Sequence, residues 1–201
     1  MAKRASTKTK QARAKRISSC PYLLRAADIK AREETGAHPW NPKSELQGTR
    51  LGTAAGLKRT GVSFVRIPAS KESFVYHAHW REEEWIYVLS GRGIAEIDGG
   101  EYEVGPGDFM GFPTPGVAHH LRNPGPGDLV YLMGGENLDF EIADFPRHGK
   151  RMIKAGGKVE IYELGSARSV ADIAAEITQR RAGPDVSTPV RAGGKARERR
   201  R

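Results

Sequence analysis

The amino-acid sequence predicts an all-β protein, an antiparallel sandwich or barrel with one helix near its C-terminal end. Short runs rich in valine, isoleucine, phenylalanine and tyrosine follow one another closely between residues 61 and 133, with turn-forming residues between them. No helical periodicity separates these runs, which favours an antiparallel arrangement. The 24 glycines and 12 prolines among 201 residues are typical of a turn-rich β protein, and this length corresponds to about one domain.

Eight segments are predicted strands, and many of them are separated by glycine, proline or aspartate. They are residues 61–67, 73–80, 85–90, 93–97, 101–104, 109–112, 117–122 and 128–133. Asp98-Gly99 is a strong hairpin signal, because these residues suit a two-residue turn. Outside this block, residues 22–34 could form a short helix, residues 36–58 an irregular segment or an edge strand, and residues 158–164 a further strand.

The pattern changes from strand to helix at residues 169–180. Apolar side chains at positions 170, 173, 174 and 177 follow the spacing of an amphipathic helix. Ser169 and Asp172 resemble a capping box at its start, and Gly183-Pro184 would end it. We expect this helix to pack on the barrel and to mark the end of the fold.

The net charge of +9 is concentrated at the two ends of the chain. Residues 1–20 hold seven basic residues and no acidic one, and residues 180–201 hold eight basic and two acidic residues. Both segments lack apolar periodicity, so we expect disordered basic tails around a single domain at residues 21–179. Such tails could make weak, nonspecific contacts with nucleic acid, or could be solvated and have no partner.

The composition also restricts the location of the protein. The single cysteine, Cys20, excludes an internal disulfide and a cysteine-rich zinc module, and it suits a reducing compartment. No apolar run reaches the length of a transmembrane helix, and the basic N-terminus is not followed by the apolar stretch of a secretory signal. We therefore expect a cytoplasmic protein with no membrane partner.

Histidine and glutamate side chains are placed where they can meet. His77 and His79 are two residues apart on a predicted strand, so their side chains leave the same face. Glu84 opens the next strand, and a third histidine, His119 or His120, follows later. Either member of the histidine pair could instead be a surface residue or a hydrogen-bonded core residue, and the acidic run 82–84 could be a solvated loop.

Three imidazoles and one carboxylate would form a site for a divalent transition metal. This donor set suits Mn, Fe, Ni, Cu or Zn and disfavours the soft-metal chemistry of thiolates. Four protein ligands on an octahedral ion would leave two positions for water or a chelating substrate, as in a catalytic metal site.

These residues resemble the two motifs of the cupin superfamily. The first motif has His-x-His, three or four residues, Glu, six residues and Gly, which His77, His79, Glu84 and Gly91 match. The second is matched from Gly107 to Asn123 with one extra residue in Pro113-Thr114-Pro115-Gly116, so a slight bulge is expected there. The resemblance implies a double-stranded β-helix, or jelly-roll barrel, over about residues 61–135. It also implies the metal ligands His77, His79, Glu84 and His119. Strand alternation then points His120 away from the metal, toward solvent or toward a residue that contacts the ligands from outside.

Residues 47–65 and 144–150 resemble a bacterial group of single-domain cupins sometimes labelled sugar-phosphate isomerases. A sugar phosphate would require a basic partner for its phosphate. The nearest candidates, Arg66, Arg81 and Arg122, do not lie on the predicted ligand-bearing face. This placement counts against the isomerase label.

Strand alternation predicts what surrounds the metal. Val75, Ile86 and Val88 would share the inward face and line a mostly apolar cavity. Six apolar side chains would face outward: Phe74, Tyr76, Trp80, Trp85, Tyr87 and Leu89. Residues 21–58, the C-terminal helix or a second subunit could cover this face. Cupins commonly dimerise through such surfaces, so we expect a homodimer, with packing inside one chain as the alternative.

Three functions are compatible with these features. The first is a metal-dependent enzyme acting on a small oxygen-rich molecule, by isomerase or epimerase chemistry or by dioxygenase chemistry. The second is a non-catalytic cupin that binds a small molecule or a metal as a sensor. The third is a stable barrel with vestigial ligands, against which the filling of all four ligand positions argues.

Overall fold

A computed structural model of the chain describes residues 20–182. The predicted tails lie outside the described residues, except for Cys20 and residues 180–182, which end a helix rather than begin a disordered segment. The chain divides into two compact units, Met1–Tyr162 and Glu163–Arg201, and each is described by itself. A single domain over residues 21–179 stays a prediction.

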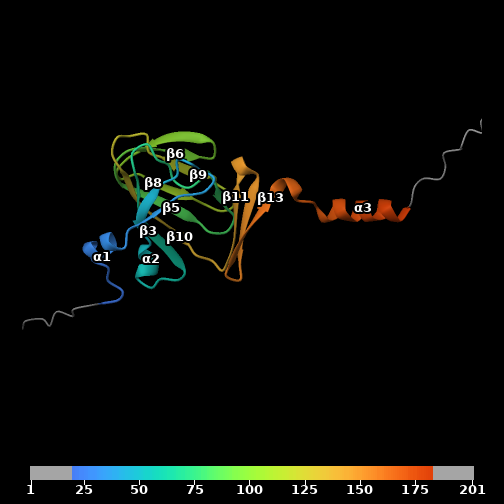
Figure 1. The fold of residues 1–201 in the computed structure, drawn as a ribbon, viewed down its shortest axis with the longest axis horizontal. Helices are drawn as coiled ribbons and strands as arrows, with labels where there is room; N and C mark the ends of the chain where they lie inside the picture. Colours follow the sequence, from blue (N-terminus) through green and yellow to red (C-terminus); the bar gives the residue numbers. More distant parts are fainter. Residues whose placement is uncertain (1–19, 183–201) are drawn as a thin grey trace, which may run out of the picture. The chain divides into compact units, whose positions relative to one another are not determined.

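The described part of the first unit contains antiparallel strands in three sheets (Figure 1). The largest has the order β1 (Glu34–Gly36), β2 (Leu46–Thr49), β3 (Thr60–Ile67), β10 (Leu129–Glu136), β5 (Glu84–Ser90) and β8 (Phe109–Phe112). The second has the order β13 (Lys158–Glu163), β12 (Lys150–Ala155), β11 (Phe140–Phe145) and β4 (Ala78–His79). The third has the order β7 (Gly100–Val104), β6 (Gly93–Ile97) and β9 (His119–Arg122). Short helices lie at α1 (Ala26–Ala31), α2 (Leu51–Ala54) and a 3-10 turn η1 (Pro146–His148).

The predicted all-β barrel is confirmed, and two strands have the predicted bounds. β6 and β8 coincide with the predicted segments 93–97 and 109–112. The predicted hairpin joins β6 to β7, with φ angles of 48° at Asp98 and 82° at Gly99. These positive angles explain why an aspartate-glycine pair occupies this turn.

The prediction of a strand over residues 73–80 is largely wrong. Only β4, Ala78–His79, is a strand there, and the residues before it run between sheets. Their backbone bonds go to different partners: Ser73 N–H donates to Leu121 O, and the carbonyl of Phe74 accepts the side-chain amide of Asn41. The apolar alternation of this segment therefore reflects burial against several elements instead of one continuous ladder.

Two strands of the second sheet, β11 and β12, were not predicted from the sequence. Their alternation is hidden by charged residues such as Glu141, Asp144 and Lys154. Glu141 nevertheless has no exposed surface, so an acidic residue occupies a position that the pattern reserves for an apolar one. The partners that make this burial possible are described below.

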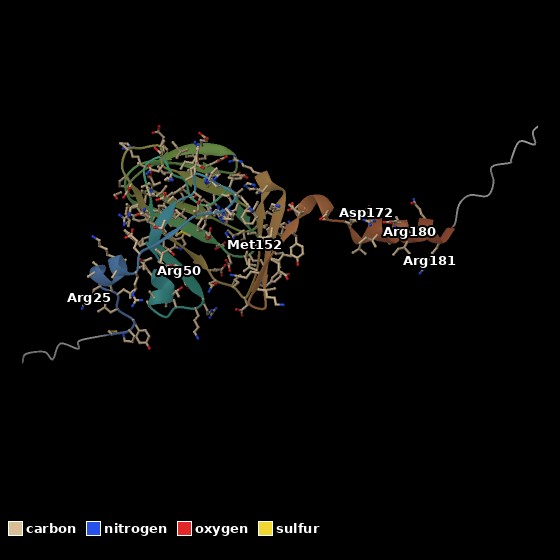
Figure 2. All side chains as sticks on the ribbon, viewed as in Figure 1. Arg25, Arg50, Met152, Asp172, Arg180 and Arg181 are labelled. Atoms are coloured by element: carbon tan, nitrogen blue, oxygen red, sulfur yellow. The ribbon has the colours of Figure 1, made fainter. Side chains whose placement is uncertain are left out.

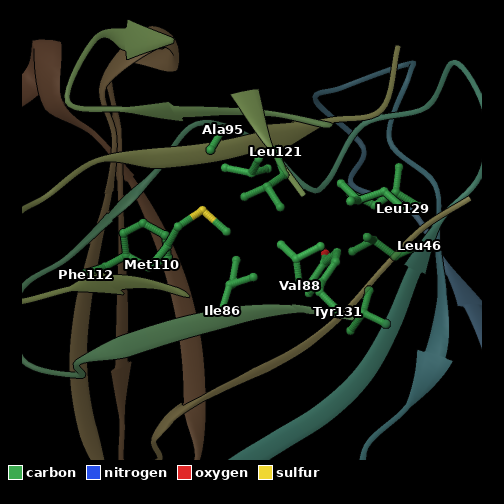
Figure 3. Packing of buried hydrophobic residues seen from close by; sticks show 12 residues of the cluster. Leu46, Ile86, Val88, Ala95, Met110, Phe112, Leu121, Leu129 and Tyr131 are labelled. Atoms are coloured by element: carbon green, nitrogen blue, oxygen red, sulfur yellow. The ribbon is translucent and has the colours of Figure 1, made fainter. Parts of the chain in front are cut away.

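The core lies between the sheets of the first unit (Figure 3). Ile86 and Val88 of β5 are buried, whereas the intervening Tyr87 and the following Leu89 are each 40% exposed. Inward side chains of neighbouring strands complete the cluster, including Ala95, Met110, Phe112, Leu121, Leu129 and Tyr131. Strand alternation thus gives the strands of this core one apolar face each, and burial of these faces stabilises the barrel.

Arginine side chains cover two of the aromatic residues that were predicted to face outward. The guanidinium of Arg147 lies 4.3 Å from the centre of the Tyr76 ring, and that of Arg151 lies 4.7 Å from the centre of the Trp80 ring. Both arginines belong to the segment from η1 to β12, which also carries Met152 (Figure 2). These contacts are cation–π interactions within the chain.

The second unit contains the predicted C-terminal helix, α3 (Val170–Ala182). Ser169 and Asp172 exchange the reciprocal hydrogen bonds of a capping box, as the sequence predicts. The packing of its apolar side on the barrel stays a prediction. Within residues 20–182, none of the helices is both long and apolar enough to cross a membrane.

Candidate metal centre

Three strands place the four predicted ligands at one point. His79 ends β4, Glu84 begins β5 and His119 begins β9, and His77 lies just before β4. His77 and His119 form a backbone bridge in which His77 N–H donates to His119 O at 3.2 Å and His119 N–H donates to His77 O at 2.8 Å. This bridge fixes their ring centres 4.5 Å apart.

The three histidine rings converge on one carboxylate oxygen. The distances to Oε2 of Glu84 are 3.1 Å from His119 Nε2, 3.4 Å from His79 Nε2 and 3.9 Å from His77 Nε2. Glu84 is the acidic residue that the motif spacing selects over Glu82 and Glu83. The structure thus brings together the residues His77, His79, Glu84 and His119, which we call the histidine–glutamate cluster.

The other nitrogen of each ring is held by an acceptor. His77 Nδ1 lies 2.8 Å from Val75 O, His119 Nδ1 lies 3.2 Å from Val117 O, and His79 Nδ1 lies 3.3 Å from Oε1 of Glu141. Because a carbonyl or carboxylate oxygen can only accept a hydrogen bond, each Nδ1 must carry the proton. A ring protonated on both nitrogens donates from Nε2 to Glu84, whereas a ring that has lost the Nε2 proton presents its lone pair at the same place, where a metal ion can take it.

Burial and neighbouring charges adjust the protonation of this cluster. Burial, assisted by His119, lowers the pKa of His77 from 6.5 to about 3. Burial disfavours ionisation of Glu84, but hydrogen bonds from His119 and His79 outweigh it and hold the pKa of this carboxyl well below its usual range. Burial also opposes the charging of His79, yet Glu84 and Glu141 raise its pKa above 6.5. Near neutral pH, His77 is thus an uncharged candidate ligand and Glu84 an anionic one.

The donor set fits a divalent transition metal. One ligand atom from each of His77, Glu84 and His119 lies within 4.8 Å of the others, and the Nε2 of His79 faces the same carboxylate oxygen. Imidazole nitrogens and a carboxylate suit the metals from manganese to zinc. The hydrogen bonds at each Nδ1 are the outer contacts that orient histidine ligands in metal sites.

A second group of titratable side chains adjoins the cluster, and sequence reasoning missed it. His79, Glu82 and Glu141 also offer ligand atoms within 4.8 Å of one another. However, Glu82 Oε1 accepts the ammonium of Lys154 and the N–H of Leu138. No motif or periodicity in the sequence could have indicated that Glu141, some 60 residues further along the chain, would contact His79.

The cluster lies at the wall of a cavity of about 300 Å³. Most other wall residues are apolar, among them Val75, Ile86, Leu121, Met133, Ala143, Phe145 and Met152. The predicted lining by Val75 and Ile86 is confirmed, whereas Val88 packs in the core. Phe74 and Trp85 were predicted to face away, but both contribute to this wall, because the irregular path of residues 73–77 and the mouth of the barrel expose them to it.

The arginines that were considered as substrate ligands have other partners. Arg66 pairs with Glu33 and Asp128, and Arg122 pairs with Glu101. Arg81 lies over the ring of Phe140. None of these three residues is part of the cavity wall.

His120 points away from the cluster, as alternation predicts, but it does not reach solvent. Its side chain is buried, and its Nε2 lies 3.8 Å from Oε2 of Glu72. The loop between Pro113 and Gly116 precedes these histidines and turns at Gly116, whose φ of 86° favours glycine. The extra residue leaves His119, and not His120, at the cluster.

Comparison with known proteins agrees with this fold. A family model described as a cupin domain matches residues 63–135, which include the whole cluster. A protein of Acidithiobacillus ferrooxidans, provisionally described as a sugar phosphate isomerase, has a solved structure with 36% sequence identity and a TM-score of 0.71. The match covers 75% of this chain and 97% of that chain.

Two further matches are weaker in sequence. A sugar phosphate isomerase from a cupin superfamily of Silicibacter pomeroyi has 23% identity and a TM-score of 0.63, over 75% of this chain and 98% of that chain, which supports the fold. An uncharacterized protein of Methanocaldococcus jannaschii is 34% identical over 59 residues, 29% of this chain and 46% of that protein. The aligned segment thus spans less than half of the archaeal protein.

The molecule is therefore an antiparallel β-barrel with a cluster of inward-facing histidines. The chain belongs to the cupin superfamily, as the extensive match to the Acidithiobacillus structure and the cupin-domain match establish.

Proposed function

We propose that the protein is a metal-dependent enzyme in which His77, His79, Glu84 and His119 hold one divalent transition metal. The observation that carries this proposal is the common orientation of the three rings. Each Nδ1 is committed to an acceptor, and each Nε2 faces the same oxygen of Glu84. Once the Nε2 protons are released, the lone pairs of three rings are directed at one point, which is the arrangement of histidines that coordinate a metal.

When bound, the metal would act as a Lewis acid on an oxygen of the substrate. The chain would supply orientation and a dry environment: the Nδ1 partners hold the rings, and the apolar wall excludes water from the cavity. The wall favours a small molecule with an oxygen-bearing group directed at the cluster and an uncharged, largely apolar body.

Tyr131 is the wall residue best suited to contact the oxygen-bearing group. It lies on β10, next to β5, and its side chain is buried at the cavity. Burial, with a contribution from the negative charge of Glu84, raises the pKa of the Tyr131 hydroxyl. The hydroxyl therefore stays protonated and can donate a hydrogen bond to a substrate oxygen.

Two reaction classes use such a site. Isomerase chemistry, in which a proton moves next to a metal-polarised carbonyl, is supported by the description of the Acidithiobacillus relative. Dioxygenase chemistry is supported by a histidine-rich site that leaves positions open for a second ligand. The apolar wall favours an unphosphorylated substrate in either class.

Metal analysis of protein purified without an affinity tag tests the proposal. We expect about one transition-metal ion per chain, and a His79→Ala variant with clearly less metal. Unchanged metal content in that variant would show that the assignment is wrong.

Assays of the metal-loaded protein with candidate substrates, with and without dioxygen, separate the two reaction classes. Consumption of dioxygen identifies a dioxygenase, whereas turnover under anaerobic conditions identifies an isomerase. Binding of such compounds without any turnover would instead identify a non-catalytic sensor.

A further inference from the structure

Glu141 is a fully buried carboxylate at a position that strand alternation reserves for an apolar residue. It lies on β11, and its exposed fraction is 0%. Burying an ionised carboxylate is costly unless hydrogen bonds replace those of water. Here Oε1 accepts the backbone N–H of Trp80 at 3.0 Å and of Arg81 at 3.4 Å, and Oε2 accepts the N–H of Glu82 at 2.8 Å.

The same carboxylate holds one ring of the histidine–glutamate cluster. Oε1 of Glu141 lies 3.3 Å from Nδ1 of His79. The contact follows from strand pairing: Ala143 of β11 lies opposite His79 of β4, and Trp80 N–H donates to Ile142 O at 2.9 Å. Glu141 therefore binds both His79 and the three residues that follow it.

These residues, 80–82, are the connection toward Glu84. His77 and His119 rely on main-chain carbonyls for the orientation of their rings, and no side-chain substitution removes those acceptors. His79 is the member of the cluster whose Nδ1 depends on a side chain. A single carboxylate thus controls the direction of one ring and the path of the chain to the next ligand.

We infer that Glu141 is a positioning residue, whose carboxylate keeps the proton of His79 on Nδ1 and its Nε2 directed at Glu84. This inference rests on the proposed metal site. Glu141 does not act as a ligand itself, because its two oxygens already accept three backbone N–H groups and the His79 ring. Glu82 is not an equivalent alternative, because Lys154 and Leu138 occupy its Oε1.

The test compares Glu141→Gln with the matched control Asp144→Asn. Both substitutions remove one negative charge from β11 and leave one acceptor oxygen in place of two. Both carboxylates also accept an N–H of Trp80, Glu141 from the backbone and Asp144 Oδ2 from the indole at 2.9 Å. Asp144 is instead paired with Arg151 and does not contact His79. A difference between the two variants therefore reports the contacts of Glu141 with His79 and with the backbone of residues 80–82.

Zinc affinity of the full metal-free chain is measured by competition with a chromophoric chelator. We expect Glu141→Gln to bind Zn²⁺ about 10- to 100-fold more weakly, the loss seen when the outer partner of a ligating histidine is removed. We expect Asp144→Asn to stay within about threefold of the wild type, the scatter of surface-type substitutions. In a His79→Ala background, the additional loss caused by Glu141→Gln should largely disappear, since contacting residues are coupled.

Nuclear magnetic resonance of the zinc-loaded protein provides a readout that stability alone would not move. The Nδ1 proton of His79 should be visible and slow to exchange in the wild type and in Asp144→Asn, and shifted in Glu141→Gln. If Glu141→Gln does not fold, the wild-type spectrum carries the test, and a His79 ring without a proton on Nδ1 would overturn the inference.

The remaining outcomes separate this inference from the proposed function. A wild-type chain that binds no transition metal refutes the metal site. If the Glu141→Gln variant binds zinc as tightly as the wild type, the role of Glu141 is refuted while the metal site stands. Two bound ions in the wild type and one in Glu141→Gln would also refute it, because Glu141 would then be a ligand.

Discussion

Two adjacent histidines on β9 show how differently the two faces of one strand are used. His119 and His120 are 4% and 5% exposed, so burial does not distinguish them. The ring of His119 has a partner at each nitrogen, Val117 O and Glu84 Oε2, and it stacks on Phe112 with ring centres 3.7 Å apart. In contrast, neither ring nitrogen of His120 has a hydrogen-bond partner among the described residues.

The surroundings of His120 are nevertheless charged. Glu96 lies opposite His120 on β6, and Glu72 approaches from the loop before β4. Both carboxylates are engaged elsewhere, Glu96 by Arg147 and Glu72 by the amide of Asn41. The comparison teaches that a buried histidine indicates a metal site only where a second group fixes the proton on the opposite nitrogen.

The sharpest way to break this comparison is to remove each histidine in turn. His119→Ala should weaken Zn²⁺ binding by about 100-fold or more, because a direct ligand matters at least as much as its outer partner. His120→Ala should stay within about threefold of the wild type, because its ring points to the opposite side of β9. Competition with a chelator measures both affinities.

Equal losses in the two alanine variants would contradict the assignment of His119. Circular dichroism spectra of both variants should match that of the wild type, which shows that neither loss arises from unfolding.

Much of this arrangement could be predicted from the sequence. The spacing of His77, His79 and Glu84 depends on a two-residue period and a short connection, which are local properties of the chain. The sequence spacing from Gly116 and to Asn123 selected His119 over His120, and the structure places the ring of His119 against Glu84. The hairpin at Asp98-Gly99 was likewise set by local turn chemistry.

The contacts that sequence reasoning missed are all long-range. In the sequence, Glu141 resembles an ordinary polar strand residue. Its role becomes visible only in the structure, where backbone N–H groups of residues 80–82 donate to its carboxylate. Trp85 was assigned outward by alternation, but it is the second residue of β5, beside Glu84, and it contributes to the cavity wall. A periodicity describes one element at a time and does not show what the end of that element contacts.

Leu121 sharpens the comparison by separating packing from coordination. It follows the two histidines, shares the inward face with His119 and is 1% exposed. Leu121→Ala should lower the free energy of unfolding by about 2–5 kcal/mol, since it removes buried methyl groups and leaves a cavity. The zinc affinity of the folded variant should change by less than about threefold, because the Leu121 side chain does not hold the histidine rings against Glu84.

Denaturant titration measures the stability of Leu121→Ala, and chelator competition measures its affinity. A large loss of zinc affinity in the folded variant would mean that core packing, and not the acceptors at Nδ1, sets the orientation of the rings.

The smallest expected effect concerns the loss of folding stability in acid that His120 causes. Burial lowers the pKa of His120 below its ordinary value of 6.5, although Glu72 and Glu96 oppose this shift. The unfolded chain therefore binds a proton at this position that the folded chain releases, and His120 reduces stability as the pH falls through 6.5. His120→Leu removes this contribution, so the variant should lose less stability than the wild type between pH 8 and pH 5, by roughly 1 kcal/mol or less. Thermal unfolding of the metal-free proteins at both pH values measures this difference. If His120→Leu loses as much stability as the wild type or more, the His120 ring is protonated, and hence partnered, in the folded protein.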